Sequence, residues 1–381
     1  MDEKRDILSM NLPELQETLT AAGQPKFRAA QVYHWLHQKK AQSFSVMMDI
    51  PSKLREELDA QFCIKSLFIA RKLASSVDDT VKYLYRLPDG QHVETVLMHY
   101  HNGWRLCIST QVGCKMGCAF CASTIAGYVR DLLPSEMLLQ ITETERDAGV
   151  EISGLVLMGI GEPMDNFDNV RRFLELLSDP EGRGMSLRHV TVSTCGIVPR
   201  IRALADRKTG LTLAVSLHNP TNEGRSAVMP VNRRYPLEEL MEACRYFFQQ
   251  TGRRVTYEYA VMEGENDGES DAKALAKLLR GQGAHVNLIP VNKVRERSYH
   301  ATRKAAQQFM QRLERLGVHA TVRRTLGSDI EAACGQLRHE ADKQYQNRGE
   351  GRCSAGQQRI SVSFVKKIRT GWKPVNMTDI S

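Results

Sequence analysis

The 381-residue sequence has no long hydrophobic run and no low-complexity tract. No apolar stretch approaches the length that a helix needs to cross a bilayer. The opening residues MDEKRDILSMNLPEL also lack the apolar segment of a signal peptide. We therefore expect a cytoplasmic protein with no membrane partner. Its cysteines should stay reduced there and serve as ligands or catalysts rather than as disulfide staples.

Positive charge, by contrast, is in excess: 52 Lys and Arg stand against 44 Asp and Glu, a formal net charge of +8. Cations and aromatic side chains are interleaved between Pro25 and Lys40, and residues 338–381 hold nine Lys or Arg but only four Asp or Glu. Such segments bind phosphate and stack on bases, although a solvated basic surface has the same composition. Charge alone leaves both interpretations open.

Short helical patterns occupy residues 12–23, 27–40 and 52–62, with glycine and proline between them. We predict a helical accessory domain over residues 1–62 and a β extension or linker over 63–104. A core over 105–345 and a basic C-terminal tail over 346–381 would complete the chain.

Seven apolar runs mark the predicted core, from RLCIST (105–110) to HATVRRT (319–325), and helical patterns separate most of them. This alternation predicts parallel βαβ units, in either a barrel or a doubly wound sheet. Both folds bind ligands at the loops that follow the carboxyl ends of the strands. Those loops begin here with CKMGCAFC, GIGEP, STCG, SLHNP and IPVN, all of them small, polar or cysteine-rich. We expect the active site at this edge.

Three of the nine cysteines, Cys114, Cys118 and Cys121, lie within eight residues. A structural zinc site needs four ligands, usually two C-x2-C pairs well apart in the sequence. Cys107 could be a fourth ligand here, but the alternation of the strand pattern RLCIST decides where its side chain points. Three thiolates can instead hold a four-iron cluster with one iron open to a small molecule. The spacing favours the cluster, with a zinc site and incidental thiols as alternatives.

The C-x3-C-x2-C loop resembles that of the radical S-adenosylmethionine (SAM) enzymes, which carry a [4Fe-4S] cluster on it. Residues 159–163, GIGEP, lack the third glycine of a dinucleotide fingerprint and would alone read as a tight turn. In radical SAM enzymes the corresponding Gly-Glu segment grips the amino group of SAM. Together with VETV at 93–96 and DIEAACGQL at 329–337, these motifs resemble the RlmN/Cfr family of RNA adenosine methyltransferases, from about residue 10 to 345.

This resemblance implies an α/β enzyme with a partial (βα)6 radical SAM barrel. Its implied substrates are an adenosine in the peptidyl-transferase region of 23S rRNA and the adenosine 3′-adjacent to the tRNA anticodon, both methylated at C2. The GIGEP sequence favours this branch over the C8-methylating, Cfr-like branch, which remains the alternative; a zinc-stabilised RNA-binding module is the alternative of another class. The resemblance also implies one [4Fe-4S] cluster per chain, two SAM molecules per turnover and an external one-electron reductant of the flavodoxin type. We expect a monomer, because the RNA surface must stay accessible.

The resemblance further assigns roles to residues. A first SAM would methylate Cys334; a hydrogen would then be taken from that methyl group, and the resulting radical would join adenine. Glu94 would remove the proton, and Cys107 would free the RNA by forming a transient disulfide with Cys334. The cluster ligands would be Cys114, Cys118 and Cys121, and the SAM contacts would be Gly161, Glu162, Ser193, Ser216, Leu217, His218 and Asn292.

The RNA-facing surface implied by the resemblance comprises the N-terminal helices and the basic loop from Lys293 to Lys304. Residues 354–381 extend past the resemblance. These residues could form an RNA-binding extension or a disordered tail, and we favour the disordered tail.

Overall fold

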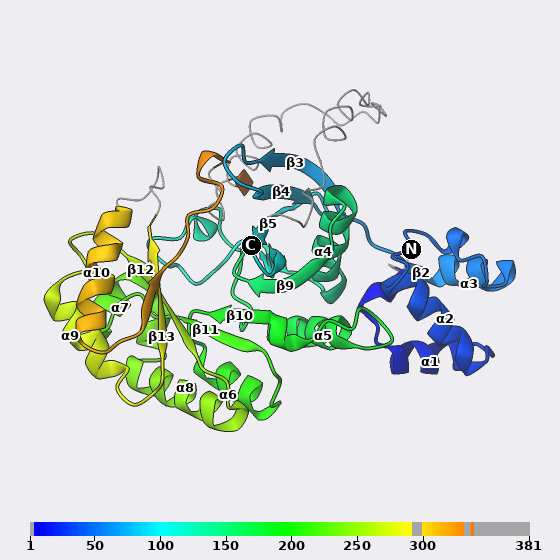
Figure 1. Cartoon of the computed structure of the whole chain (residues 1–381). Helices are drawn as coiled ribbons and strands as arrows, with labels where there is room; N and C mark the ends of the chain where they lie inside the picture. Colours follow the sequence, from blue (N-terminus) through cyan, green and yellow to red (C-terminus); the bar gives the residue numbers. More distant parts are fainter. Residues whose placement is uncertain (1–3, 292–298, 331–336, 339–381) are drawn as a thin grey trace, which may run out of the picture. The chain divides into compact units, whose positions relative to one another are not determined.

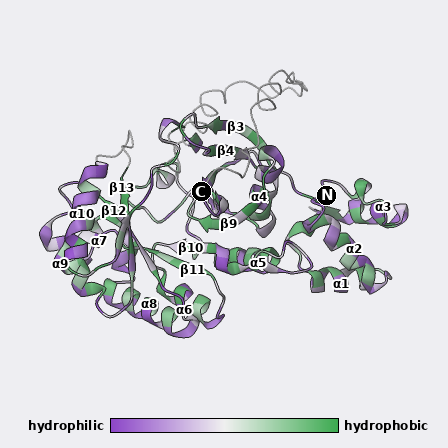
Figure 2. Ribbon diagram, viewed as in Figure 1, coloured by the Kyte–Doolittle hydropathy of each residue, from purple (hydrophilic) through white to green (hydrophobic). Residues whose placement is uncertain are grey.

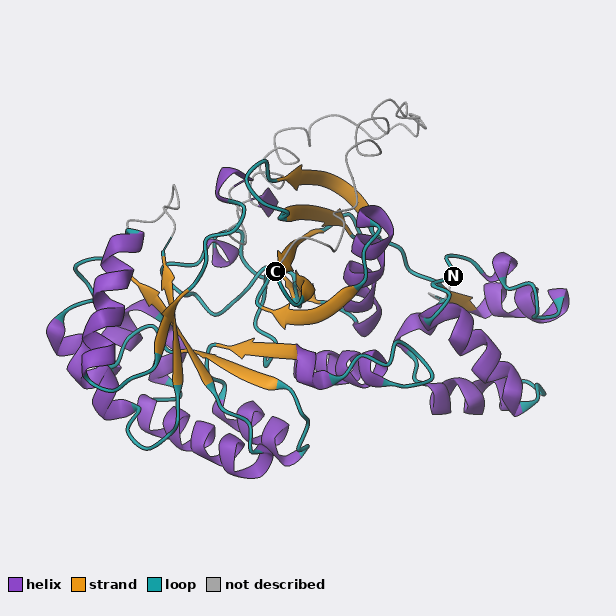
Figure 3. Ribbon diagram, in the orientation of Figure 1, coloured by secondary structure: helices purple, strands orange, loops and turns teal. Residues whose placement is uncertain are grey.

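The computed structural model describes residues 4–291, 299–330, 337 and 338. The chain divides into two compact units, Met1–Asp342 and Lys343–Ser381, and every described residue belongs to the first. A search of the described residues finds no helix with the length and hydrophobicity to span a membrane. A ten-stranded sheet forms the centre of the first unit (Figures 1 and 3).

Three helices begin the chain: α1 (Leu12–Ala21), α2 (Lys26–His37) and α3 (Ser52–Gln61). A capping box starts α1, because Asn11 Oδ1 accepts from the backbone of Glu14 at 3.0 Å and Glu14 accepts from the backbone of Asn11 at 3.1 Å. The short strands β1 (Arg5–Asp6) and β2 (Phe62–Cys63) pair in parallel and join the two ends of this region. The three predicted helices are confirmed.

One side of the main sheet is antiparallel. It contains β3 (Phe68–Ala74), β4 (Val81–Arg86), β5 (His92–Tyr100) and β6 (Gly103–Cys107), each paired with the next. Seven successive residues at the start of β5 are buried, so both faces of this strand are covered. A charged side chain on β5 must therefore find a partner inside the protein.

From β6 onward the sheet is parallel. The strands continue in the order β9 (Ile152–Leu157), β10 (Val190–Thr194), β11 (Thr212–Ser216), β12 (Thr256–Val261), β13 (His285–Pro290) and β14 (Ala320–Val322). With β6 these are the seven predicted apolar runs. The first six are each followed by helix and β14 ends the series, while β3 and β14 remain as edges. The predicted α/β class and partial (βα)6 barrel are confirmed.

The connecting helices are α4 (Pro134–Ala148), α5 (Phe167–Ser178), α6 (Val198–Asp206), α7 (Asn222–Val228), α8 (Leu237–Thr251), α9 (Glu269–Leu278) and α10 (Arg303–Arg315). They pack along one side of the parallel strands, and their hydrophobic residues contribute to the core (Figures 1 and 2). The periodicity of the sequence predicted all but α6 and α7. Those two are short, and the second is too polar to show an apolar stripe.

Shorter elements complete the described chain. Strands β7 (Gln111–Val112) and β8 (Arg130–Asp131) form an antiparallel pair directly after β6. Single-turn 3-10 helices lie at Ile7–Ser9, Phe44–Val46, Ala122–Thr124, Leu187–His189, Pro230–Arg233 and Ser328–Ile330. The loop enclosed by β7 and β8 carries the three-cysteine motif.

Candidate active site

The pairing of β7 with β8 holds the cysteine loop closed at its base. Gly113 enters the loop with φ +80°, and a Cβ there would lie 1.7 Å from the carbonyl oxygen of Gly127. Only glycine fits this close approach. The loop is therefore compact, and Cys114, Cys118 and Cys121 all line one cavity of about 380 Å³.

Burial favours the protonated thiol at two of these cysteines. It raises the pKa of Cys114 to about 12 and also raises that of Cys118, with smaller contributions from the neighbouring cysteines. Iron binding must displace such protons. Among the described residues, no group of three or more His, Cys, Asp or Glu side chains is arranged so that it could hold a single metal ion. A four-iron cluster is larger than one ion, so three thiols facing a shared cavity suit a cluster better than a zinc site.

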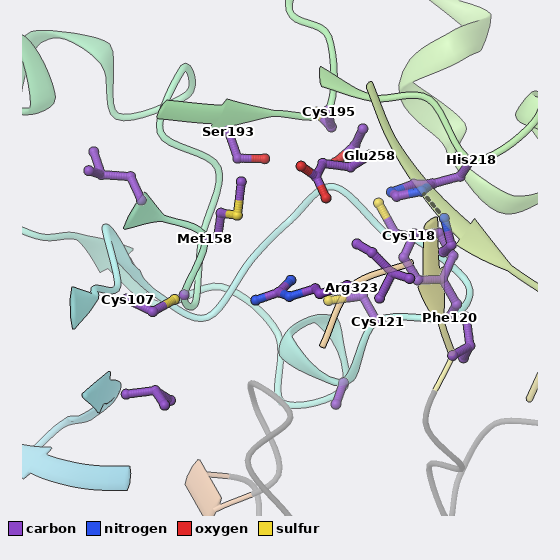
Figure 4. Close-up of a pocket in the computed structure, with 18 of the residues that line it drawn as sticks. Cys107, Cys118, Phe120, Cys121, Met158, Ser193, Cys195, His218, Glu258 and Arg323 are labelled. Atoms are coloured by element: carbon purple, nitrogen blue, oxygen red, sulfur yellow. Dashed lines mark hydrogen bonds between the residues drawn. The ribbon is translucent and has the colours of Figure 1, made fainter. Parts of the chain in front are cut away.

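The other strands bring their ends to the same cavity, as the loop positions predicted. Cys107 on β6, Gly161 and Glu162 after β9, Ser193 on β10, and Ser216 and His218 on and after β11 all line it. Figure 4 shows several of them facing the common space. The side chain of Leu217 instead lies in the hydrophobic core. Asn292 and Cys334 lie outside the described residues.

The Gly-Glu segment is built into the floor of this cavity. Gly161 has φ +111°, and a Cβ there would lie 2.7 Å from the backbone nitrogen of Gln111. The carboxylate of Glu162 accepts from the backbone nitrogens of Met164 at 3.0 Å and Cys195 at 2.7 Å. Burial raises the pKa of Glu162 despite these bonds. Its side chain thus ties the loop after β9 to the loop after β10.

His218 links the cysteine loop to β12. Its Nδ1 accepts from the backbone of Ala260 at 2.9 Å, and its ring meets that of Phe120 edge-on at 4.7 Å. Burial, and the nearby charge of Arg225, lower the pKa of His218 to about 3. The ring is therefore neutral and carries its proton on Nε2, where it can act as a hydrogen-bond donor. Its φ of +58° shows that the loop holds it in a conformation unusual for a residue with a side chain.

Glu94 lies on β5 and is 1% exposed. One of its oxygens lies 3.1 Å from the ammonium of Lys82 on β4, whose side chain is completely buried. The other accepts from the backbone nitrogen of Arg338 at 2.8 Å. The structure thus joins the predicted base to a residue four positions after Cys334, a proximity that spacing in the sequence did not reveal.

Polar residues that line the cavity, among them Glu258 and Arg323, were missed by the sequence reasoning. Glu258 on β12 is buried and accepts from Asn287 at 2.8 Å. Burial raises the pKa of Glu258, against the charge of Arg323, which also lines the cavity (Figure 4). A carboxylate inside the apolar strand TYEYAV was the signal that could have identified Glu258.

The structure does not support the expected disulfide. None of the cysteines that it describes is joined to another by a disulfide bond, and Cys107 is a buried thiol. The expected partner, Cys334, lies outside the described residues. The resemblance implies this bond only as a transient step of catalysis.

The cavity therefore combines the thiols of three cysteines on one tight loop with polar groups at the ends of successive parallel strands. A three-thiol cluster site beside a small-molecule pocket in a partial (βα)6 barrel defines the radical SAM class of proteins. Two family models match the chain: the radical SAM superfamily over residues 108–278, and the ribosomal RNA large subunit methyltransferase N-terminal domain over residues 5–64.

Comparisons of the whole chain with known proteins identify the family within this class. A probable dual-specificity RNA methyltransferase RlmN of Lachnospira eligens is 48% identical over 336 residues, which cover 88% of this chain and 96% of that protein. The protein of the same name from Clostridioides difficile is 47% identical over 341 residues, covering 89% and 99%. The crystal structure of a radical SAM methyltransferase from Sphaerobacter thermophilus matches with a TM-score of 0.83 and 41% identity, covering 87% and 98%. The chain belongs to the RlmN family, and it is a radical SAM RNA methyltransferase.

Proposed function

We propose that this enzyme methylates C2 of adenosine at two places, the peptidyl-transferase region of 23S rRNA and the position 3′-adjacent to the tRNA anticodon. One observation carries the proposal: Glu94, the predicted base, accepts a hydrogen bond from Arg338, only four residues after Cys334. A base held against the segment that carries a methylated cysteine is what a route through a covalent protein–RNA adduct needs. The curated relatives named dual-specificity RNA methyltransferases support the choice of two RNAs.

Cys114, Cys118 and Cys121 would hold the [4Fe-4S] cluster, one per chain. Gly161, Glu162, Ser193, Ser216, Leu217, His218 and Asn292 would surround SAM. When bound, the cluster and SAM together supply a one-electron cleavage that generates a hydrogen-abstracting radical. The hydroxyls of the two serines and the Nε2 donor of His218 suit the ribose and carboxylate oxygens of SAM.

The protein residues would act as follows. Cys334 carries the one-carbon unit, supplied by a first SAM, and bonds to adenine through it. Glu94 takes the proton from C2, aided by its fixed position beside Lys82, and the adduct gives up its one unpaired electron, which the cluster would accept. The sulfur of Cys107 then attacks the sulfur of Cys334; as the S–S bond forms, the bond from sulfur to the transferred carbon breaks. That carbon takes up a proton and leaves as a methyl group on the RNA.

RNA would be held by the N-terminal helices. On α2, Phe27 is 55% exposed and the guanidinium of Arg28 lies 4.8 Å from the centre of its ring. Lys39 lies 3.7 Å from the ring centre of Trp35. Paired cations and aromatic faces of this kind bind single-stranded RNA through phosphate contacts and base stacking. We extend this surface to the loop from Lys293 to Lys304, whose first part lies outside the described residues.

The same proposal places the enzyme in the cytoplasm, where both RNAs occur, as a monomer. An external one-electron reductant of the flavodoxin type would supply electrons, and two SAM molecules would be used per turnover. The basic residues 346–381 lie outside the described residues, and we assign them no role.

The decisive experiment incubates the anaerobically reconstituted enzyme with 23S rRNA or tRNA and analyses the digested RNA by mass spectrometry. We expect 2-methyladenosine from both RNAs; 8-methyladenosine would instead assign the enzyme to the other branch of the family. Iron and sulfide should each be about four per chain. A protein that contains zinc alone and transfers no methyl group would refute the proposal.

Cysteine variants test the order of events. Cys334→Ala should abolish methylation while leaving the iron content unchanged. Cys107→Ala should trap a protein–RNA adduct that survives denaturing electrophoresis, because the releasing thiol is gone. Cys63→Ala, a change on β2 away from the cavity, is the matched control and should turn over normally. Normal turnover by Cys107→Ala would remove Cys107 from the mechanism.

A further inference from the structure

Arg225, on α7, is a fully buried cation bonded only to neutral oxygens among the described residues. It donates to the carbonyls of Cys195 at 2.6 Å, Ser216 at 3.1 Å and Leu217 at 3.2 Å, and to Oδ1 of Asn232 at 2.8 Å. No Asp or Glu within the described chain forms an ion pair with it. The guanidinium is well hydrogen-bonded, but no acidic side chain of the described residues compensates its charge.

Such a charge is costly to bury. Carbonyl and amide oxygens satisfy the N–H groups, but they do not neutralise a cation that has left water. Burial lowers the pKa of Arg225 to about 10, so it stays charged at neutral pH. The fold thus maintains a fixed positive charge beneath the cavity, and an anion bound above it would recover the electrostatic cost.

The cysteine loop lies directly on this part of the protein. Ala119, between two of the cysteines, donates from its backbone to the carbonyl of Val228 at 2.9 Å, at the end of the helix that carries Arg225. Cys118 packs with Val228 in one buried cluster. The helix that carries Arg225 is thus in direct contact with the cysteine loop.

We propose that Arg225 is a fixed counter-charge for the iron–sulfur cluster and that it raises the reduction potential of that cluster. The inference rests on the proposed cluster at the three cysteines. Three thiolates make the site anionic, and the electron taken from the external donor adds one more negative charge. A buried cation nearby stabilises the reduced form more than the oxidised form, and charge and hydrogen bonding around a cluster are known determinants of its potential.

The test compares Arg225→Met, which removes the charge, with Arg225→Lys, which keeps the charge but loses most of the hydrogen bonds. The potential of each reconstituted full-length enzyme is measured without SAM by redox titration followed by electron paramagnetic resonance. We expect Arg225→Met to lower the ratio of reduced to oxidised cluster at least tenfold, a shift of about 59 mV for one electron. Arg225→Lys should stay close to the wild type, and so should Arg233→Met, which removes an exposed cation from the neighbouring turn.

Equal shifts in Arg225→Met and Arg225→Lys would mean that the hydrogen bonds matter and not the charge, and would overturn the inference. An unchanged potential with weaker SAM binding in Arg225→Met would also overturn it, because the counter-charge would then serve the carboxylate of SAM. A wild-type protein that assembles no cluster would refute the proposed function instead.

Asn232→Asp provides a test that keeps Arg225 in place. It sets a carboxylate 2.8 Å from the guanidinium and should lower the potential as Arg225→Met does. Asn232→Ala also loses the amide donors but adds no charge, and should match the wild type. If Arg225→Met and Asn232→Asp both fail to retain iron while Arg225→Lys and Asn232→Ala retain it, the result still supports the counter-charge. Loss of iron in all four variants would assign Arg225 a purely structural role.

Discussion

The buried pair of Lys82 and Glu94 gives the sharpest quantitative prediction. Their side chains are 0% and 1% exposed and their charged atoms lie 3.1 Å apart. Lys82 stands opposite Val96 and Glu94 stands opposite Leu84, so the two are diagonal neighbours on adjacent antiparallel strands. At an effective dielectric constant of about 20, Coulomb's law gives about 5 kcal/mol for two unit charges at this distance.

Lys82→Met should therefore lower the free energy of unfolding by about 3–5 kcal/mol, since it removes the opposite charge from a carboxylate buried inside the sheet. Glu94→Gln should cost a similar amount. The double variant should recover much of the loss, because replacing both partners of a buried pair costs far less than removing one. Urea denaturation measures these free energies, and hydrogen exchange at the amides of β4 and β5 locates the change.

Strictly additive losses in the two single variants and the double variant would refute the reasoning, because they would show that the two charges do not interact. The pair also matters for catalysis under the proposed function. The ammonium of Lys82 holds the carboxylate of Glu94 in position, so its loss should impair the proton transfer. Lys82→Met and Glu94→Gln should then both accumulate the protein–RNA adduct. Rapid release of RNA by Lys82→Met would contradict this role.

Three further predictions concern the site and its supports. Gly161→Ala should abolish SAM binding in equilibrium dialysis, because its Cβ would overlap β7. Gly149→Ala, at φ +66° with no atom near its new Cβ, should cost only about 1–2 kcal/mol of stability. The free energy of unfolding should fall as pH drops from 6.5 toward 4, because burial lowers the pKa of His37 to about 4 and of His218 to about 3, so the unfolded chain takes up their protons first. Asp329→Ala removes three hydrogen bonds to the turn between β3 and β4, and mass spectrometry should show less methylated Cys334 at unchanged iron content.

Each of these predictions has a result that would contradict it. Equal SAM binding by the two glycine variants would show that the contact with β7 is unimportant. A double variant with both histidines replaced by asparagine that kept the full acid dependence would assign it to other groups. Unchanged methylation of Cys334 in Asp329→Ala would show that the turn does not position the segment that follows.

The sequence by itself determined the elements and the edge at which the site lies. Seven apolar runs became seven parallel strands, and the cysteine loop and the segments GIGEP, STCG and SLHNP follow them, because strand and helix periodicity and turn residues are local properties of the chain. The same local reasoning missed α6 and α7. Neither is long enough for a clear period, and packing against the barrel stabilises them instead.

Only the tertiary structure decided which charges meet. Nothing in the spacing pairs Lys82 with Glu94, brings Arg338 to the same carboxylate, or places Arg225 under the cysteine loop. These contacts join residues that are far apart along the chain or diagonal across two strands, so they depend on register and on the packing of one loop upon another. A buried charged group also needs a partner of opposite charge. The sequence shows which residues could be that partner, but only the fold determines which of them lies in contact with it.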